Sequence, residues 1–361
     1  MTPPRKKTSS TSSPRSRSHG QPVSLKQLAK SLGLSTTTLS LVLNGSEKAQ
    51  SIPQDTKDRI FAAARALNYR PNFLARSLRS QRTFSVGVII PELSDGYASL
   101  VLTGIEDHLL QSGYLYLVTS HRHNEKQITD GPRLLFERSV EGLIAVDTRY
   151  EQNLPIPVVT VSGHRELPDV TNIVLNHERA AELALTHLTN LGHREIAVIK
   201  GQEFSSDTAV RWEAIHKVAR RLSIPVPPRL VQQMEGKSAS PEVGYQAMVR
   251  LLRSCVRFTA LLAFNDVCAI GAIRALREAG RRVPEDVAVI GFDDIHEARY
   301  HIPALTTVRQ PLQQMGRLAA EILLARISDP QKPQPHFIHV EPELIVREST
   351  AAAKVAIGSG R

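Results

Sequence analysis

The sequence predicts a small all-α head followed by a larger α/β core built on parallel sheets. Three observations support this fold class: an uneven distribution of charge, short helical patterns before residue 83, and alternation of apolar runs with amphipathic stretches after it. The chain of 361 residues is also longer than one ordinary domain. At least two compact units are therefore expected.

Positive charge is concentrated at the amino-terminal end. The first 82 residues hold 15 of the 45 Lys and Arg residues and 3 of the 35 Asp and Glu residues. Their net charge is therefore +12, and the net charge of the remaining residues is −2. Lys and Arg displace counterions from a phosphate backbone, so this asymmetry predicts a nucleic-acid partner. Residues 1–22 are also rich in Ser, Thr and Pro and are expected to form a disordered basic tail.

Three short helical patterns follow this tail. Ser24 can cap the first helix and Gly33 ends it, Ser35 can cap the second, and Pro53 suits the first position of a third that ends before 69–71. The residues expected to face inward are Leu25, Leu28, Ala29, Leu32, Leu39, Val42, Leu43, Ile60, Ala63, Ala64 and Leu67. A small Ala29 and a glycine turn between the first two helices are typical of a helix-turn-helix. The alternative is an ordinary small helical bundle.

The pattern changes after Thr83. Apolar runs expected to be buried strands lie at 84–90, 114–118, 142–146, 158–161, 195–199, 259–263 and 287–290. Helical stretches lie at 98–112, 177–191, 207–221, 241–254, 266–279 and 311–327. This alternation predicts parallel sheets with helices on both faces, whose ligands bind beyond the strand ends.

Several classes of protein are disfavoured by what the sequence lacks. Cys255 and Cys268 are the only cysteines and form no Cys-x-x-Cys pair, so neither a disulfide framework nor a structural zinc site is supported. His121 and His123 lack an acidic or Cys partner and are expected in a solvated loop; no metal and no cofactor is predicted. Without a secretory or membrane-spanning apolar stretch, a cytoplasmic protein with no membrane partner is expected.

Several stretches together resemble the LacI/GalR (lactose repressor/galactose repressor) family over residues 23–349. They are VSLKQLAKSLGLSTTTLSLVLNG, LNYRPNFLARSLRSQRTFSVGVIIP, NLGHREIAVIKG, and AFNDVCAIGAIRALREAGRRVPEDVAVIGFDD followed by PALTTVRQP. The resemblance implies a cytoplasmic, nucleoid-associated transcription regulator, in most cases a repressor. It further implies a homodimer that reads a pseudo-palindromic double-stranded operator. A sugar-like small-molecule effector would bind between two periplasmic-binding-protein-like subdomains.

The resemblance also implies a division of the chain. The helix-turn-helix domain spans 23–71, a hinge helix and linker span 72–82, the core spans 83–349, and a flexible tail spans 350–361. Within the core, the first subdomain is expected at about 83–162 and 294–325 and the second at about 163–293 and 326–349. The tail lacks leucine heptads, which favours a dimer over a tetramer.

Family positions for DNA contact fall mainly on the second helix and the hinge, with one on the third helix. Thr36, Thr37 and Leu41 match base-reading positions, whereas Ser35, Thr38, Ser40, Asn44 and Thr56 are better placed for phosphates. Leu41 replaces the Arg of many relatives; it either packs on a thymine methyl or faces the small core. Asn72, Ala75 and Leu78 lie in a hinge too short to be a stable isolated helix, and Leu78 would wedge between base steps in the minor groove.

Family positions for effector contact fall on loops at strand ends. They are Ser94, Tyr97, Ser162, Arg211 and Asp266, with Arg211 and Asp266 expected to bracket hydroxyls or ring nitrogens from opposite walls. Tyr97 either stacks on the ligand or packs at a helix start. Ser162 stands where relatives often have Asp and Ala214 where they have Gly, which leaves the effector's identity open.

Two other functions fit part of the sequence. The core alone would suit a solute-binding protein or an α/β enzyme without DNA-dependent function. No GxGxxG, GxxxxGK[ST] or Gly-x-Ser-x-Gly motif is present, so an enzyme is not expected. The basic head has no use in a solute-binding protein, which favours the regulator.

Overall fold

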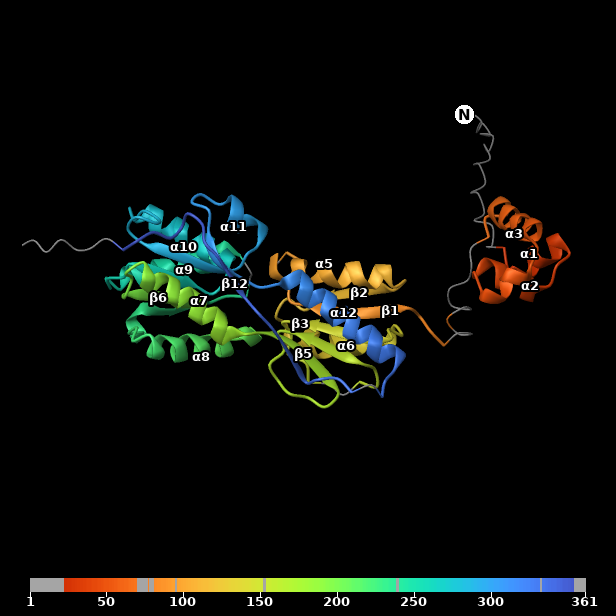
Figure 1. The fold of residues 1–361 in the computed structure, drawn as a ribbon, viewed down its shortest axis with the longest axis horizontal. Helices are drawn as coiled ribbons and strands as arrows, with labels where there is room; N and C mark the ends of the chain where they lie inside the picture. Colours follow the sequence, from red (N-terminus) through yellow and green to blue (C-terminus); the bar gives the residue numbers. More distant parts are fainter. Residues whose placement is uncertain are drawn as a thin grey trace, which may run out of the picture. The chain divides into compact units, whose positions relative to one another are not determined.

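The computed structural model describes residues 23–69, 77, 81–94, 96–151, 154–237, 240–331 and 333–353 (Figure 1). The chain divides into two compact units between Arg82 and Thr83. The first unit is the helical head and the second is the α/β core, in agreement with the predicted fold class.

The head contains three α-helices and a short 3-10 helix within its described residues. They are α1 (Leu25–Leu32), α2 (Thr36–Leu43), η1 (Glu47–Ser51) and α3 (Gln54–Ala66). Ser24 Oγ accepts the Gln27 N–H while Gln27 Oε1 accepts the Ser24 N–H at 2.8 Å, which forms a capping box. Gly33 ends α1 with φ +65°, a left-handed conformation that glycine adopts without strain. The predicted cap at Ser24 and the turn at Gly33 are confirmed.

A small hydrophobic core holds the head together. Its buried members are Leu28, Ala29, Leu39, Val42, Ala49 and Ile60. Two details of the predicted third helix are wrong. Pro53 has the extended ψ of 142° and precedes α3 as its N-cap instead of forming its first turn. Leu67 is 41% exposed because α3 ends at Ala66 and Leu67 follows it as the C-cap residue.

The first sheet of the core has six parallel strands in the order β11-β5-β4-β3-β1-β2. Its strands are β1 (Ser85–Ile90), β2 (Leu115–Ser120), β3 (Gly142–Val146), β4 (Val158–Val161), β5 (Val170–Leu175) and β11 (Phe337–Val340). Helices α5 (Gly96–Gln111), α6 (Glu125–Glu137) and α12 (Leu312–Ser328) pack against it. β1 and β3 are buried almost throughout, as expected of strands covered on both faces.

The second sheet has the order β12-β10-β9-β8-β6-β7, and only β12 pairs antiparallel in it. Its strands are β6 (Ile196–Lys200), β7 (Val231–Gln233), β8 (Ala260–Ala263), β9 (Ala288–Asp293), β10 (Thr306–Arg309) and β12 (Glu343–Ile345). The helices of this half are α7 (His177–Asn190), α8 (Ser206–Arg221), η2 (Pro228–Leu230), α9 (Pro241–Arg253), α10 (Asp266–Glu278) and α11 (His296–Tyr300).

The predicted subdomain limits are wrong at three strands. β5 and β11, assigned to the second subdomain, lie in the first sheet, and β10, assigned to the first subdomain, lies in the second sheet. Buried polar side chains interrupt the apolar pattern of β5 and β10. In β5, Asn172 Oδ1 accepts the Thr160 hydroxyl at 2.5 Å; in β10, Thr306 and Thr307 are fully buried. The chain therefore crosses between the sheets after β5, after β10 and after β11.

Two helices of the first half pack unusually closely. A Cβ built on Gly104 of α5 would lie 1.9 Å from Gln313 O, and one built on Gly316 of α12 would lie 2.0 Å from Val101 O. Only glycine permits this approach, and Figure 1 shows α12 beside α5. Among the described helices, none is both long and apolar enough to cross a membrane.

Candidate functional site

Helix α2, which is predicted to contact DNA bases, carries several exposed hydroxyl groups. Ser35, Thr36 and Thr37 are exposed at the start of α2, while Leu39 and Val42 on the opposite side are buried. Ser35 Oγ accepts the Thr38 N–H at 3.0 Å, which confirms the predicted cap, and lies 2.8 Å from Thr38 Oγ1. One side of α2 therefore packs in the core of the head, and the other side is exposed.

The other proposed contacts on the head differ in exposure. Asn44 is exposed and its Nδ2 donates to Ser40 O at 2.8 Å and to Ser40 Oγ at 3.1 Å; Thr56 is half-buried at the start of α3. Leu41 is half-buried and packs partly against the core of the head. It is therefore compatible both with packing in that core and with contact to a thymine methyl. The hinge residues Asn72, Ala75 and Leu78 lie outside the described residues.

Polar residues gather where strands of the two sheets end. Asp147 after β3, Ser162 after β4 and Asp293 at the end of β9 have φ of +38°, +59° and +107°. Such left-handed backbone is uncommon outside glycine, costs about 1–3 kcal/mol for each residue, and is concentrated at ligand sites. These strand ends are therefore the first candidates for the effector site.

Tyr97 and Ser162, both predicted effector contacts, touch each other. The Tyr97 hydroxyl lies 2.6 Å from Ser162 Oγ, and only 8% of Tyr97 is exposed. Burial raises the pKa of Tyr97 well above its usual value, and the charges of Asp207, Asp147 and Asp293 raise it further. Tyr97 is thus a neutral hydroxyl within electrostatic reach of three carboxylates.

The amino end of α8 connects the two halves of the core. Asp147, from the first half, accepts the Ser206 N–H at 3.1 Å and the Ser206 hydroxyl at 2.6 Å, and that hydroxyl also lies 2.6 Å from Ser162 O. A carboxylate is favoured at this position because a helix amino terminus carries partial positive charge. His123, in the loop after β2, stacks on Phe204 with ring centroids 3.8 Å apart, a second contact between the halves.

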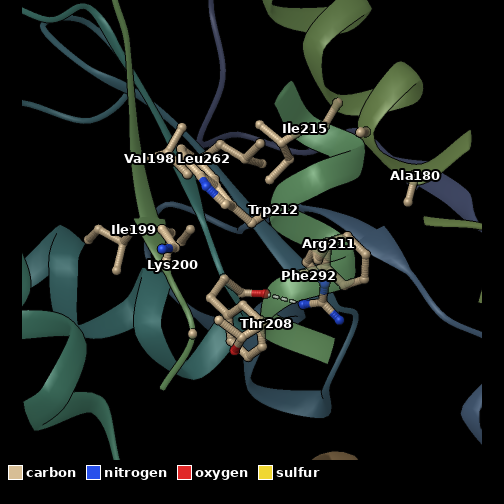
Figure 2. Close-up of a pocket in the computed structure, with 15 residues that line it drawn as sticks. Ala180, Val198, Ile199, Lys200, Thr208, Arg211, Trp212, Ile215, Leu262 and Phe292 are labelled. Carbon is tan, nitrogen blue, oxygen red and sulfur yellow. Dashed lines mark hydrogen bonds between the residues drawn. The ribbon is translucent and has the colours of Figure 1, made fainter. Parts of the chain in front are cut away.

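Arg211 lies one helical turn after this junction. Its Nη2 donates to Asp207 Oδ2 at 2.9 Å. Its Nη1 donates to Phe264 O at 2.5 Å, and Figure 2 shows Arg211 beside Phe292. Its Cζ lies 3.7 Å from the centre of the Phe292 ring and 4.4 Å from that of Phe264. Arg211 Nε has no hydrogen-bond partner among the described residues. The guanidinium is therefore held by its neighbours, with one buried donor available to a ligand.

Asp207, which is not among the predicted site residues, is the carboxylate that pairs with Arg211. Its Oδ1 lies 2.6 Å from His164 Nε2 and 3.3 Å from His177 Nε2. Burial alone would raise the pKa of Asp207, but His177, His164 and Arg211 together hold it well below its usual range. Asp207 and Arg211 are spaced four residues apart on a helix, a signal visible in the sequence, whereas the two histidines come from other elements.

Asp266 does not form the expected wall opposite Arg211. It is fully buried, its Oδ1 accepts the Thr307 hydroxyl at 2.6 Å, and its Oδ2 accepts the Ile295 N–H at 2.9 Å. Burial raises its pKa to about 7. In the structure Asp266 ties α10 to β10 and to the segment after β9, and its contact with an effector stays a prediction.

Two further expectations change. Ser94 is exposed, donates to Glu92 Oε2 at 3.3 Å, and lines a groove with α5, α10 and α11 instead of joining Tyr97 and Ser162. His121 is not in a solvated loop: it is buried, with Nε2 3.0 Å from Thr148 Oγ1, and burial lowers its pKa to about 4.

A small apolar cavity lies beside Arg211 but is not the site itself. It is lined by helices α7 and α8 and by strands of the second sheet, with Lys200, Trp212 and Phe292 among its residues (Figure 2). Its volume of about 20 Å³ suits one water molecule. Pockets that bind small molecules are usually about 300–1,000 Å³, so this space, although lined in part by Arg211 and Thr208, is too small to hold an effector by itself.

Comparisons with known proteins cover almost the whole chain. Residues 24–72 match the family described as bacterial regulatory proteins, lacI family, and residues 185–350 match the periplasmic binding protein-like domain. The HTH-type transcriptional repressor PurR of Haemophilus influenzae is 34% identical over 337 residues, which are 90% of this chain and 98% of the relative. That of Photorhabdus laumondii is 34% identical over 335 residues, covering 90% and 96%.

Solved structures give the same result. The lac repressor dimer bound to operator and the anti-inducer ONPF superposes with a TM-score of 0.79 at 29% identity, covering 92% of this chain and all of that one. The transcriptional regulator CelR in complex with cellobiose superposes with a TM-score of 0.67 at 26% identity, covering 91% and 99%.

Proposed function

This chain belongs to the lacI family of bacterial regulatory proteins, and from that premise we propose which of its residues read DNA and which sense the effector. It is a DNA-binding transcriptional repressor controlled by a small molecule. The relatives named above are repressors and a transcriptional regulator, so we infer that this chain acts without catalysing a reaction. We further infer that it acts in the cytoplasm at the nucleoid, as a dimer on a pseudo-palindromic operator.

The exposed start of α2 is the observation that supports the DNA-reading assignment. Thr36 and Thr37 carry hydroxyl and methyl groups on the side of α2 that the head's core leaves uncovered. In the major groove such side chains can bond to base edges or pack on thymine methyls. Leu41, half-buried, offers its remaining surface to a thymine methyl.

The remaining head residues are assigned to positioning. Ser35, Thr38, Ser40, Asn44 and Thr56 are proposed to bond to phosphates, which fix the register of the head without specifying sequence. Asn72, Ala75 and Leu78 are proposed to enter the minor groove, with Leu78 as the wedge between base steps. A wedge of this kind unstacks a step at a cost of a few kcal/mol, offset by the larger contact with bent DNA.

The effector is assigned to the groups around the amino end of α8. Tyr97, Ser162 and Arg211 provide a hydroxyl pair and a buried guanidinium donor, and Asp207 replaces Asp266 as the carboxylate beside Arg211. Hydroxyl, carboxylate and guanidinium groups together suit a polyhydroxylated, sugar-like ligand. The solved structure of CelR, a similar protein, is of its complex with cellobiose.

Control of DNA binding would follow from a shift between two arrangements of the core. Ligand contacts from both sheets favour one arrangement, and a ligand moves the equilibrium only by its difference in affinity for the two. The contacts of Asp147 and Ser162 with Ser206 are the part of this junction that can change when a ligand enters.

Selection of operators from a random duplex library by the full chain, followed by fluorescence anisotropy, tests this assignment. We expect a pseudo-palindromic site, and about tenfold weaker binding by Thr37→Ala, because a lost base contact is worth about 1–3 kcal/mol. Ser31→Ala removes an exposed hydroxyl from α1 and serves as the matched control. Equal binding by Thr37→Ala and Ser31→Ala would refute the assignment of α2.

A further inference from the structure

Three metal-ligating side chains converge at the junction between the halves of the core. His164, His177 and Asp207 each offer a ligand atom, and these atoms all lie within 4.8 Å of one another. In a tetrahedral zinc site, bonds of about 2.0–2.2 Å place ligand atoms about 3.3–3.6 Å apart. The distance from His177 Nε2 to Asp207 Oδ1 is already 3.3 Å, and that from His164 Nε2 is 2.6 Å. Small side-chain movements would therefore complete the geometry.

His177 provides an independent sign of a ligand. It is 95% buried, since only 5% is exposed, and neither ring nitrogen makes a hydrogen bond of acceptable geometry among the described residues. Its Nε2 is close to Asp207 but poorly aligned with it. Buried polar atoms are nearly always satisfied by protein, water or an ion, so an imidazole whose two nitrogens lack a well-aligned partner among the described residues is suited to bind an ion.

The chemistry of these groups favours a divalent transition metal. Two imidazoles and one carboxylate form a ligand set for zinc-like ions, in contrast to the all-oxygen sets of calcium and magnesium. Burial lowers the pKa of His177, which keeps its imidazole in the neutral form that binds metal. The side chain of His164 is 17% exposed, which gives an ion a route from solvent.

The charge around the triad also suits a cation. Asp207, Asp147 and Asp293 all act electrostatically on Tyr97 from this junction. Arg211 engages Asp207 through Oδ2, which leaves Oδ1 directed at the two histidines. A dication at Oδ1 would share the carboxylate of Asp207 with Arg211, which already holds Oδ2.

The three residues come from both halves of the core. His164 lies in the loop between β4 and β5 of the first sheet, Asp207 lies in the first turn of α8, and His177 begins α7 after the chain has crossed to the second half. We propose that His164, His177 and Asp207 bind one zinc-like divalent ion, which ties the first half of the core to the second. A fourth coordination position would remain for water or for an oxygen of the effector.

The regulatory consequence of this site rests on the proposed function, whereas the site itself does not. An ion coordinated from both halves stabilises the arrangement in which they meet, and so shifts the same equilibrium as the effector. Operator affinity should therefore change when metal is added. The amino end of α8 would then sense two ligands.

Titration of the full-length, metal-stripped chain with Co²⁺ tests the site directly. We expect one Co²⁺ for each chain, with the visible absorption of a four- or five-coordinate ion. His177→Asn and His164→Asn should each weaken binding about 100-fold or more, since even the loss of an outer-shell partner costs up to about that much. His339→Asn, which changes an exposed histidine on β11, is the matched control and should bind like the unaltered chain.

Two outcomes overturn the proposal: no stoichiometric Co²⁺ binding by the unaltered chain, or equal Co²⁺ affinity in His177→Asn and His339→Asn. Because all variants keep the head, their operator binding without metal is measured in parallel by anisotropy. Absence of Co²⁺ binding by the unaltered chain together with intact operator binding refutes the metal site alone, whereas absence of operator binding in every protein refutes the proposed function. If operator affinity is the same with and without bound metal, the proposed coupling between the metal site and operator binding is refuted.

Discussion

The DNA-reading surface of the head and the junction at α8 are built in opposite ways. On α2, short uncharged side chains are exposed, and their local bonds are made within the helix, as between Ser35 and Thr38. At α8, the buried charges of Asp207 and Arg211 are held by one another and by histidines from other elements. The head can therefore lose a contact without unfolding, whereas each group at the junction depends on its neighbours.

The largest expected effect is that of Asp207→Ala. Removing this carboxylate leaves Arg211 as a buried charge without its partner, and breaking such pairs costs about 3–5 kcal/mol. Urea unfolding followed by the fluorescence of Trp212, the only tryptophan, measures the loss. Glu182→Ala breaks exposed ion pairs and should cost less than about 1 kcal/mol. Equal losses in the two variants would remove the contrast between the junction and the surface.

Asp266 should give the core an unusual pH dependence. Its folded pKa of about 7 lies above the ordinary value of 3.8, so between these values the folded chain binds the extra proton. The stability from Asp266 is present below about pH 4 and is lost as the pH rises through about 7, by at most about 4 kcal/mol.

Histidines with lowered pKa, such as His121 and His177, contribute the opposite slope, so the comparison must be made with a variant. The difference in unfolding free energy between the unaltered chain and Asp266→Asn, measured from pH 5 to pH 8, isolates the carboxyl group. It should fall with rising pH. A difference that does not vary with pH would contradict the assignment.

Gly316→Ala should cost about 3 kcal/mol or more. The new Cβ would lie 2.0 Å from the backbone oxygen of Val101, and neither helix can yield without loss of packing between α5 and α12. Gly131→Ala, also in a helix, meets the Thr119 methyl at an ordinary 3.6 Å and should be neutral or slightly stabilising. Similar melting temperatures for the two variants would show that the close packing has little effect.

The smallest effect on folding is expected for Leu41→Arg. Arginine can donate two hydrogen bonds to guanine, worth about 1–3 kcal/mol of discrimination, and its long stem can leave the partly exposed position of Leu41. Operator selection should return a different half-site while core unfolding stays unchanged. Identical half-sites for both proteins would favour the reading in which Leu41 only packs on the head's core.

Features that depend on neighbouring residues or on a periodic pattern could be predicted from the sequence. The caps Ser24 and Ser35, the turn at Gly33, and strands such as 142–146 and 158–161 were predicted correctly. Each depends on residues within a few positions of one another. The family resemblance added the order of the two units and singled out Arg211 as a candidate effector contact, which stays a prediction.

The sequence did not reveal what depends on tertiary pairing. β5 and β10 carry buried Asn and Thr that obscure an apolar run, because their partners lie on other strands. Asp266 and Asp207 each lie in the first turn of a helix. Only the fold shows that Asp266 accepts a hydrogen bond from Thr307, whereas Asp207 lies next to His164. The triad spans residues 164–207 and has no motif spacing.

Operator affinity of Asp147→Ala tests most directly whether the junction controls the head. This variant removes the carboxylate that holds Ser206 at the amino end of α8 and leaves every head residue unchanged. A shift in operator Kd of about tenfold is predicted, as for a coupling of 1–3 kcal/mol, while Glu137→Ala on the surface of α6 leaves it unchanged. Wild-type affinity in a folded Asp147→Ala protein would contradict the account.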